Sequence, residues 1–529
     1  MAKHTNAGTA ASTLSKRVPS STHSSSPATC CNFPATPEAS SGHSTIDMGL
    51  ETQNLKAYFL PYLTPSHMIP LADIAMLFAA RGVDVTIFAT PHNALLLQKS
   101  VDSAVASSHL VSVQVFDFPS KEVGLPEGVE SFSSAGSIEN AAKVFQAFMI
   151  LRQPMELVIR ESPPDCIVSD TYCLWTSDLA AELGIPRICF HVKAFFALCA
   201  ADSISCYAPH EKVQSDEDPF LLPNVPGEIR MTRSELPDWV RVPSGYTHFM
   251  NKAAEADLNC DGVVLSSIYE LESKYADHYR NVLGRKAWAL GPVFLQGQNK
   301  KNPPVDHRHS YVMNWLDSQK PNSVLYISFG TLTCFSSTQL LEIAMALQSS
   351  GTQFIWVVRQ ADGSRESEWL PEGFEKCIKG DNKGMIIRGW APQTLILEHQ
   401  ATGGFVTQCG WNSIVESVTA GVPMIAWPLS ADQFYNAKLV TRALKIGVDV
   451  GVNQWSQLVQ ESESFVSREK IEKAVGKLMG GGEEAEEMRR RTKEFGEFAK
   501  KAVEVGGSSY NDLTDLLAHV ESRKQKTQK

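Results

Sequence analysis

Short apolar strand patterns alternate with amphipathic helix patterns along most of this chain, and the alternation runs through two successive series. The first series begins with an apolar segment at residues 55–63, followed by a helix pattern that Pro70 is expected to open. Further strands of this series are expected at residues 83–87, 111–116, 166–169, 187–190 and 263–266. The second series has strand patterns at residues 324–329, 354–358, 385–387, 405–406 and 423–426, with a helix pattern at 338–347. Two such series predict an α/β protein with two doubly wound, Rossmann-like parallel sheets that face each other across a cleft.

Two changes in composition divide the chain into parts. Residues 1–50 are crowded with Ser, Thr, Ala and Pro and show no periodicity, so they are expected to form a disordered extension. A stretch rich in Pro and polar residues at 295–307 has the composition of a linker. We therefore expect a first domain at residues 51–294, a linker at 295–307 and a second domain at 308–529 that ends in helices.

Charge and cysteine content exclude several classes of protein. The 529 residues carry a formal net charge of −10, which argues against a nucleic-acid partner because phosphate binding needs clustered Lys and Arg. No run of about 18 apolar residues occurs, so no integral membrane segment is expected. The 11 cysteines include no C-x-x-C pair, so neither a zinc site nor a disulfide framework is predicted, and free thiols fit a cytoplasmic protein. The extension is rich in Ser and poor in acids, so a plastid is the alternative location if it is a transit peptide, whereas Met48 could equally begin the working protein.

One stretch, residues 390–433, carries aromatic, glycine and polar residues in an order suited to a nucleotide-linked sugar. It opens with Trp390, whose flat ring suits a base. In its middle, Gly410 stands just before a helix pattern, and the unpaired N–H groups and positive end of a helix suit a diphosphate. It closes with Asp432 and Gln433, a carboxylate and an amide that can hold sugar hydroxyls.

This stretch resembles the donor-binding signature of the plant family 1 UDP-dependent glycosyltransferases nearly from end to end, and the resemblance extends from about Leu55 to His519. It implies the two-domain GT-B fold, with the acceptor in the first domain and a UDP-sugar donor in the second. It also implies an inverting transfer of a sugar, with glucose the expected one, onto a hydroxyl of a small lipophilic plant metabolite such as a triterpenoid, steroid or flavonoid. The UDP-sugar would be a co-substrate, no cofactor or metal is implied, and the protein is expected to be a monomer.

The resemblance also assigns residues to parts of the donor. Trp390, Ala391 and Gln393 would bind the base and ribose, Glu416 the ribose hydroxyls, Thr331 and Gln408 the diphosphate, and Trp411, Asp432 and Gln433 the sugar. The full set of donor-binding residues expected on this basis is Ser66, Thr331, Trp390, Ala391, Pro392, Gln393, Gln408, Cys409, Gly410, Trp411, Asn412, Ser413, Glu416, Ser430, Ala431, Asp432 and Gln433.

Two positions depart from the family's pattern. Gln408 stands where the family usually has a histidine that helps to hold the diphosphate, and an amide can donate a hydrogen bond but cannot carry positive charge. Ser66 replaces the family's usual glycine, which alters contacts near the sugar. These departures motivate an alternative interpretation, a catalytically weak UDP-binding or metabolite-binding protein with a glycosyltransferase fold.

His67 and Asp170 are the expected catalytic residues. In open α/β sheets, ligands lie beyond the carboxyl ends of the strands, and His67 follows the first strand in a loop that is expected to precede the first helix. A neutral imidazole is suited to remove a proton from a hydroxyl, and the family's general base occupies this place. Asp170 ends the strand at residues 166–169, where its carboxylate could fix the tautomer of His67 and stabilise the imidazolium, as the family's aspartate does.

Plainer interpretations compete with some of these roles. Ser413 and Glu416 have the spacing of a capping box, in which Glu416 would only satisfy a backbone N–H. The acidic run at 216–218 has the D-x-D form of a metal-binding motif, but its polar surroundings favour a solvated loop. A nucleotide-dependent oxidoreductase is excluded because residues 63–68 contain no glycine. The sequence suggests no partner for His92, His191 or His399.

Overall fold

The computed structural model describes residues 55–295, 310–359, 369–456 and 465–527, all within one compact unit, Glu51–Lys529. The extension predicted at residues 1–50, and all but the first residue of the linker predicted at 295–307, lie outside the described residues. None of the helices in the described ranges is long and apolar enough to cross a membrane.

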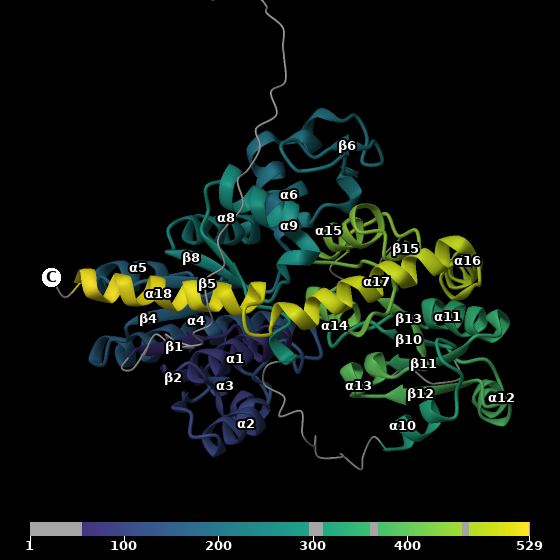
Figure 1. The fold of residues 1–529 in the computed structure, drawn as a ribbon, viewed down its shortest axis with the longest axis horizontal. Coiled ribbons are helices and arrows are strands. Elements are labelled where there is room, and N and C mark those ends of the chain that lie inside the picture. The colour runs from purple at the N-terminus through teal and green to yellow at the C-terminus, as the bar shows by residue number, and fades with distance from the viewer. Residues whose placement is uncertain (1–54, 296–309, 360–368, 457–464, 528–529) are drawn as a thin grey trace, which may run out of the picture. The chain divides into compact units, whose positions relative to one another are not determined.

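Seven parallel strands form the first sheet, in the order β3–β2–β1–β4–β5–β8–β9. Strands β1, β2, β4, β5 and β8 of this sheet are labelled in Figure 1. They are β1 (Lys56–Leu60), β2 (Asp84–Ala89), β3 (Val111–Val115), β4 (Cys166–Asp170), β5 (Arg187–His191), β8 (Gly262–Leu265) and β9 (Ala287–Ala289). Their helices are α1 (Pro65–Ala79), α2 (Pro91–Ala106), α3 (Ser120–Val123), α4 (Ile138–Glu161), α5 (Trp175–Leu183), α6 (Phe195–Tyr207), α7 (Asp238–Arg241), α8 (Gly245–Leu258) and α9 (Tyr269–Asp277). A short antiparallel pair, β6 (Phe220–Leu221) and β7 (Arg230–Met231), follows α6. Since Leu60 of β1 pairs with Ser169 of β4, the carboxyl ends of these two strands adjoin.

Six parallel strands form the second sheet, in the order β12–β11–β10–β13–β14–β15. They are β10 (Val324–Ser328), β11 (Gln353–Val358), β12 (Gly384–Arg388), β13 (Thr402–Thr407), β14 (Met424–Ala426) and β15 (Gly447–Asp449). The helices are α10 (Ser310–Asp317), α11 (Ser337–Ser350), α12 (Phe374–Gly380), α13 (Gln393–Glu398), α14 (Trp411–Ala420), α15 (Gln433–Lys438), α16 (Arg468–Met479), α17 (Glu483–Ala502) and α18 (Ser508–Thr527).

The predicted α/β class with two doubly wound parallel sheets is confirmed. The central strands β4, β5 and β10 are buried at every residue, as expected when helices cover both faces of a parallel sheet. The edge strands β9 and β15 were not predicted, because each has only three residues and so shows no strand pattern.

The first helix begins earlier than predicted. Pro70 was expected to open it, but α1 starts at Pro65, after Thr64 in an extended conformation with φ −147°. Proline fits the first helical position because the missing N–H has no partner there in any helix. Pro70 lies inside the helix, and His67 is therefore in the first turn of α1 and not in a loop.

The C-terminal helix α18 returns to the first sheet, although it follows the second sheet in the sequence. Leu513 and Leu517 pack in the same apolar cluster as residues of β1 and β2. Asp512 accepts a hydrogen bond from the N–H of Ala289 in β9 at 2.7 Å. The C-terminal helices were expected to belong to the second domain, and the attachment of α18 to the first sheet was not predicted from the sequence.

Candidate active site

His67 and Asp170, the expected catalytic residues, are hydrogen-bonded to each other. Nδ1 of His67 lies 2.6 Å from Oδ2 of Asp170, the last residue of β4. Because a carboxylate only accepts hydrogen bonds, Nδ1 carries the proton, and Nε2 is then the basic nitrogen. The other oxygen, Oδ1, accepts a hydrogen bond from the N–H of Tyr172 at 3.0 Å. Asp170 is fully buried and held at both oxygens, so it is placed to stabilise an imidazolium.

Aromatic side chains surround His67 on the side of the first sheet. The rings of Tyr62 and Tyr172 lie 5.6 Å and 5.8 Å from its imidazole. The aromatic surface continues from Tyr172 to Phe249, at 6.1 Å, and from Phe249 to Tyr246, at 6.1 Å. Burial, followed by the charge of nearby Asp170, raises the pKa of Tyr172, so its phenol stays neutral. A base beside neutral aromatic rings suits a lipophilic molecule that carries a hydroxyl group.

Helix α14 begins at the place where the sequence analysis expected a diphosphate. Gly410 is its N-cap residue and Trp411 its first residue, so the N–H groups of the first turn lack partners within the helix. Cys409, between β13 and α14, has a left-handed φ of 66°, which is uncommon for a residue with a Cβ. The N–H of Cys409 donates to Oγ1 of Thr407 at 3.2 Å and holds this turn in place. The positive end of a ten-residue helix behind such a fixed turn suits an anion.

Gln408, which replaces the family's usual histidine, lies against the loop that follows β10. A Cβ atom placed on Gly330 would be 2.2 Å from Nε2 of Gln408, so the amide packs directly over this glycine. Gly330 has a φ of 75°, a conformation that glycine adopts without strain. Thr331 is the next residue, so the structure places Gln408 beside the loop that carries the other residue expected at the diphosphate.

Two residues expected near the base and ribose, Gln393 and Glu416, form one hydrogen-bonded group with Ser413 of α14. Nε2 of Gln393 donates to Oε2 of Glu416 at 2.6 Å and to Oγ of Ser413 at 3.1 Å. Ser413 lies inside α14 and not at its N-cap, so the capping-box alternative is wrong. Burial raises the pKa of the Glu416 carboxyl to about 7, although the hydrogen bond from Gln393 acts to lower it. The side chain of Trp390 is 63% exposed, which leaves its ring open to a base.

The three residues expected at the sugar are placed in different ways. The indole of Trp411 is buried, and its Nε1 donates to the carbonyl of Ser266 at 3.0 Å, so this group is already used within the protein. Oδ2 of Asp432 accepts a hydrogen bond from Asn436, one turn further along the chain, at 3.1 Å. Oε1 of Gln433 accepts two backbone hydrogen bonds from its own loop, both at 2.9 Å, so its amide nitrogen is the atom suited to a sugar hydroxyl.

Lys193 is a charged residue of this region that the sequence analysis missed. It lies in the loop between β5 and α6, at the same carboxyl edge of the first sheet as Asp170. Burial raises the pKa of Asp432, and the charge of Lys193 is the largest effect that opposes this, ahead of Asn436. Lys193 therefore lies close to a residue expected at the sugar. Because ligands lie beyond the carboxyl ends of parallel strands, the position of Lys193 just after β5 was the signal that could have identified it.

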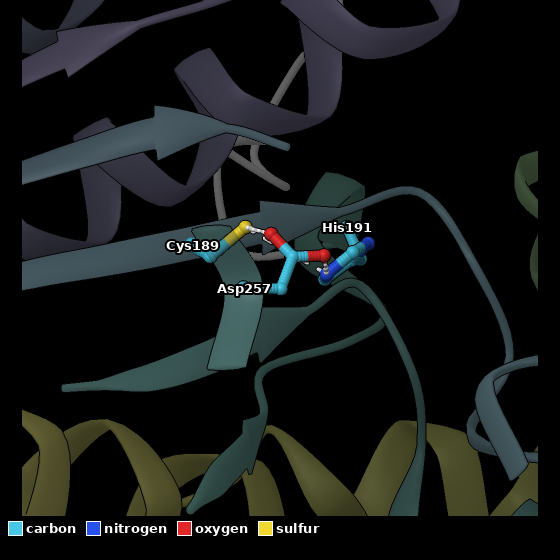
Figure 2. Close-up of side chains that lie close together, drawn as sticks. All are labelled: Cys189, His191 and Asp257. Carbon is cyan, nitrogen blue, oxygen red and sulfur yellow. Dashed lines mark hydrogen bonds and ion pairs between the residues drawn. The ribbon is translucent and has the colours of Figure 1, made fainter. Parts of the chain in front are cut away.

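A buried cluster of Cys189, His191 and Asp257 has the ligand types of a metal site (Figure 2). Sγ of Cys189 donates to Oδ1 of Asp257 at 2.8 Å, and Nε2 of His191 lies 2.9 Å from Oδ2 of Asp257. Nη2 of Arg187 lies 3.8 Å from Sγ of Cys189, and its positive charge opposes a second cation there. Burial acts to raise the pKa of Asp257, but His191, Cys189 and Arg187 together lower it to about 2. Asp257 also accepts a hydrogen bond from Thr171, which follows β4, at 3.0 Å, so we interpret the cluster as a hydrogen-bonded network that fixes the ends of β4 and β5.

Other candidates from the sequence have local roles. His399 lies 3.1 Å from Asp317, a partner that the sequence did not suggest. In the acidic run, exposed Asp216 pairs with Arg233 at 3.1 Å, and Asp218 accepts a hydrogen bond from the N–H of Ser215 at 3.0 Å. These contacts agree with the solvated loop that we expected there.

Comparisons with known proteins agree with this geometry. A family model described as UDP-glucoronosyl and UDP-glucosyl transferase matches residues 295–462. The chain is 47% identical over 475 residues to UDP-glucosyl transferase 73CC6 of Saponaria officinalis, covering 88% of this chain and 96% of that protein. It is 44% identical over 477 residues to soyasapogenol B glucuronide galactosyltransferase of Glycine max, covering 89% and 96%. The crystal structure of Glycyrrhiza uralensis UGT73P12, complexed with glycyrrhetinic acid 3-O-monoglucuronide, superimposes with a TM-score of 0.84 at 42% identity and covers 89% of this chain and 97% of that one.

Proposed function

We propose which reaction the protein catalyses from one premise: the chain belongs to the plant UDP-glycosyltransferases and is a hexosyltransferase that uses a UDP-sugar. The proposed reaction is the inverting transfer of glucose from UDP-glucose to a hydroxyl of a small lipophilic plant metabolite. The observation that carries this proposal is the bonded pair of His67 and Asp170 beside an aromatic surface.

The proposed mechanism assigns a role to each side of the site. Nε2 of His67 takes the proton of the acceptor hydroxyl as its oxygen forms a bond to the anomeric carbon. The bond between that carbon and the UDP oxygen breaks, and UDP leaves with the electron pair. The proton stays on His67, whose imidazolium is stabilised by Asp170. The N–H groups at the start of α14 and the amide of Gln408 stabilise the diphosphate charge, so catalysis rests on positioning and electrostatics.

The proposed acceptors are triterpenoids, steroids or flavonoids. The rings of Tyr62, Tyr172, Phe249 and Tyr246 form an extended apolar surface that starts at His67, which supports a bulky ring system. The names of two relatives mention soyasapogenol B glucuronide and glycyrrhetinic acid 3-O-monoglucuronide, and these support the triterpenoids among the three classes.

Glucose is the proposed sugar because the one acidic residue among those expected to hold the sugar is Asp432. Asp432 would repel the carboxylate of glucuronic acid, whereas it can accept hydrogen bonds from neutral hydroxyls. Lys193 lies close enough to Asp432 to offset part of this repulsion, so the preference depends on the balance between the two charges. A competition among UDP-glucose, UDP-galactose and UDP-glucuronic acid measures it. Preferred use of UDP-glucuronic acid would overturn the proposal.

Incubation with UDP-glucose and a panel of triterpenoid, steroid and flavonoid aglycones tests the proposal as a whole. Release of UDP in step with consumption of one aglycone is the expected result. Saturable binding of UDP without product from any aglycone would instead favour the alternative that Gln408 and Ser66 suggest, a binding protein with a glycosyltransferase fold. The His67→Ala variant is the control, since its turnover should be lost while UDP binding remains.

A further inference from the structure

A single side-chain hydrogen bond joins the first turn of α1 to the first turn of α14. Nδ2 of Asn412 donates to the backbone carbonyl of Ser66 at 2.8 Å, across 346 positions of the sequence. Ser66 immediately precedes His67, and Asn412 is the second residue of α14. The bond therefore connects the turn that carries the proposed base with the helix end that is proposed to hold the diphosphate.

Pro70 explains why the carbonyl of Ser66 accepts a bond from outside its helix. In an α-helix the carbonyl of Ser66 would accept from the N–H of residue 70, but proline has no N–H. The proline ring also crowds the carbonyl four residues before it and turns it away from the helix axis. Because Pro70 lacks the N–H that would occupy the carbonyl of Ser66, this carbonyl is available to Asn412.

The same two helices also influence each other electrostatically further along. Asp73 follows Ser66 by two helical turns, and Glu416 follows Asn412 by one, so each pair lies on one face of its helix. Burial, followed by the charge of Glu416 in α14, raises the pKa of Asp73 in α1 to about 7. The charges of α1 and α14 therefore affect each other beyond the point where Asn412 meets Ser66.

We propose that the side chain of Asn412 is a positioning residue, which holds the first turn of α1, and with it His67, at a fixed place relative to the phosphate end of α14. The proposal rests on the function proposed above. It divides the roles of Asn412, because its backbone N–H remains part of the helix end that faces the diphosphate, while its side chain serves the catalytic turn. The step that depends on the side chain is the attack of the acceptor oxygen, for which His67 and the anomeric carbon must be in register.

The first test is the Asn412→Ala variant, which removes the amide and keeps the backbone N–H. We expect kcat to fall by about 10- to 100-fold, because a misplacement of about 1 Å has effects of that order, while the Kd of UDP-glucose changes by less than about threefold. A weaker Kd with unchanged kcat would overturn the proposal and assign the amide to the diphosphate.

The second test changes the other end of the bond without touching Asn412. Pro70→Ala restores an N–H that competes for the carbonyl of Ser66, so kcat should fall in the same direction. Pro154→Ala is the matched control, because Pro154 also lies inside a helix, α4, and is exposed. Unchanged kcat in Pro70→Ala would contradict the proposal, as would an equal loss in Pro154→Ala.

Hydrogen exchange provides a readout that does not require turnover. Backbone amides in the peptide that spans the first turns of α1 should exchange faster in Asn412→Ala than in the unchanged protein, and not in Pro154→Ala. Unchanged protection would overturn the proposal even if no acceptor is found. If the exchange effect is seen but no sugar is transferred to any acceptor, the positioning contact is supported and the proposed function is contradicted.

Discussion

The two sides of the proposed site differ in what their polar groups already bind. On the side of the first sheet, His67 of α1 and Asp170 of β4 are bonded to each other in the arrangement that proton removal requires. On the side of the second sheet, residues expected to hold the donor are bonded to one another, as Gln393 of α13 is to Glu416 of α14. Oε1 of Gln433 is likewise used by its own loop. The catalytic pair is therefore set by the fold, whereas donor binding must exchange some hydrogen bonds for others.

This difference predicts a division of effects between the two sides. Exchanging one hydrogen bond for another contributes little net free energy, about 0.5–1.5 kcal/mol each, so changes on the donor side should alter the Kd of UDP-glucose by modest factors. A change in the catalytic pair removes a group that acts only during reaction, so it should alter kcat and leave that Kd in place.

The largest effect is expected for His67→Ala. Without a general base, kcat should fall by about 10²- to 10⁴-fold, while calorimetric binding of UDP-glucose is unchanged. Asp170→Asn should act in the same direction, because its amide can no longer stabilise the imidazolium. Turnover near that of the unchanged protein in His67→Ala would show that another group removes the proton.

The same division explains how far the sequence could predict the site. The donor residues are largely contained in residues 390–433, so their spacing alone indicated their chemistry. The dyad depends on residues 103 positions apart, which meet because β1 and β4 are neighbours in the sheet. The rule that ligands lie at strand ends placed both residues at one edge but gave no strand order, and the pairing of Asp170 with His67 was expected only when the family resemblance was added.

Other features could not be predicted because they depend on contacts between distant segments. Pro70 has the properties of a helix start, and only the structure shows that Pro65 takes that position instead. The partner of His191 is Asp257, on a helix whose placement against β5 has no signal in the sequence. The return of α18 to β9 rests on similarly remote pairs, such as Asp512 with Ala289.

The second prediction concerns pH and the donor side. Glu416 accepts hydroxyl hydrogen bonds best as a carboxylate, and burial raises its pKa to about 7. The affinity for UDP-glucose should therefore rise by about tenfold between pH 6 and pH 8, and Glu416→Gln should remove this dependence. A pH profile that is equally steep in Glu416→Gln would assign it to another group.

The stability of the fold should change in the opposite direction. Since the folded pKa of Glu416 lies above its ordinary value of 4.5, the protonated carboxyl contributes stability that is complete below about pH 4.5. This contribution is lost as the pH rises through about 7. Urea unfolding of the unchanged protein and of Glu416→Gln across this range measures the difference, which should shrink as the pH falls.

The third prediction uses two glycines with the same backbone conformation. Gly330→Ala and Gly351→Ala both place a Cβ at a left-handed φ, of 75° and 68°, which costs about 1–2 kcal/mol of stability in each case. Only at Gly330 does the new atom meet a side chain, Nε2 of Gln408, since nothing lies within 4 Å of a Cβ at Gly351. We expect similar losses in Tm, and a loss of UDP-glucose affinity of about 3- to 10-fold in Gly330→Ala alone. Equal affinities in the two variants would show that Gln408 has no part in donor binding.

The smallest effect, an increase in donor affinity, is expected for Gln408→His. Gln408 packs over Gly330, where the missing Cβ leaves room at the loop, and its Oε1 lies 3.3 Å from Oγ1 of Thr407. An imidazolium would add a charge-assisted hydrogen bond to the diphosphate, roughly twice as strong as the neutral bond of an amide. Because the end of α14 already supplies part of the field, the expected gain is about 1 kcal/mol, or several-fold in the Kd of UDP-glucose.

The gain should be larger at pH 6 than at pH 8, since the ordinary imidazole pKa of about 6.5 lies between them. The matched control is Gln400→His, because Gln400 is exposed and lies between α13 and β13. It should leave the Kd unchanged. An unchanged or weaker affinity in Gln408→His would mean that the turn before α14 is built around the amide, and that the donor side tolerates exchange of partners less than its hydrogen bonds suggest.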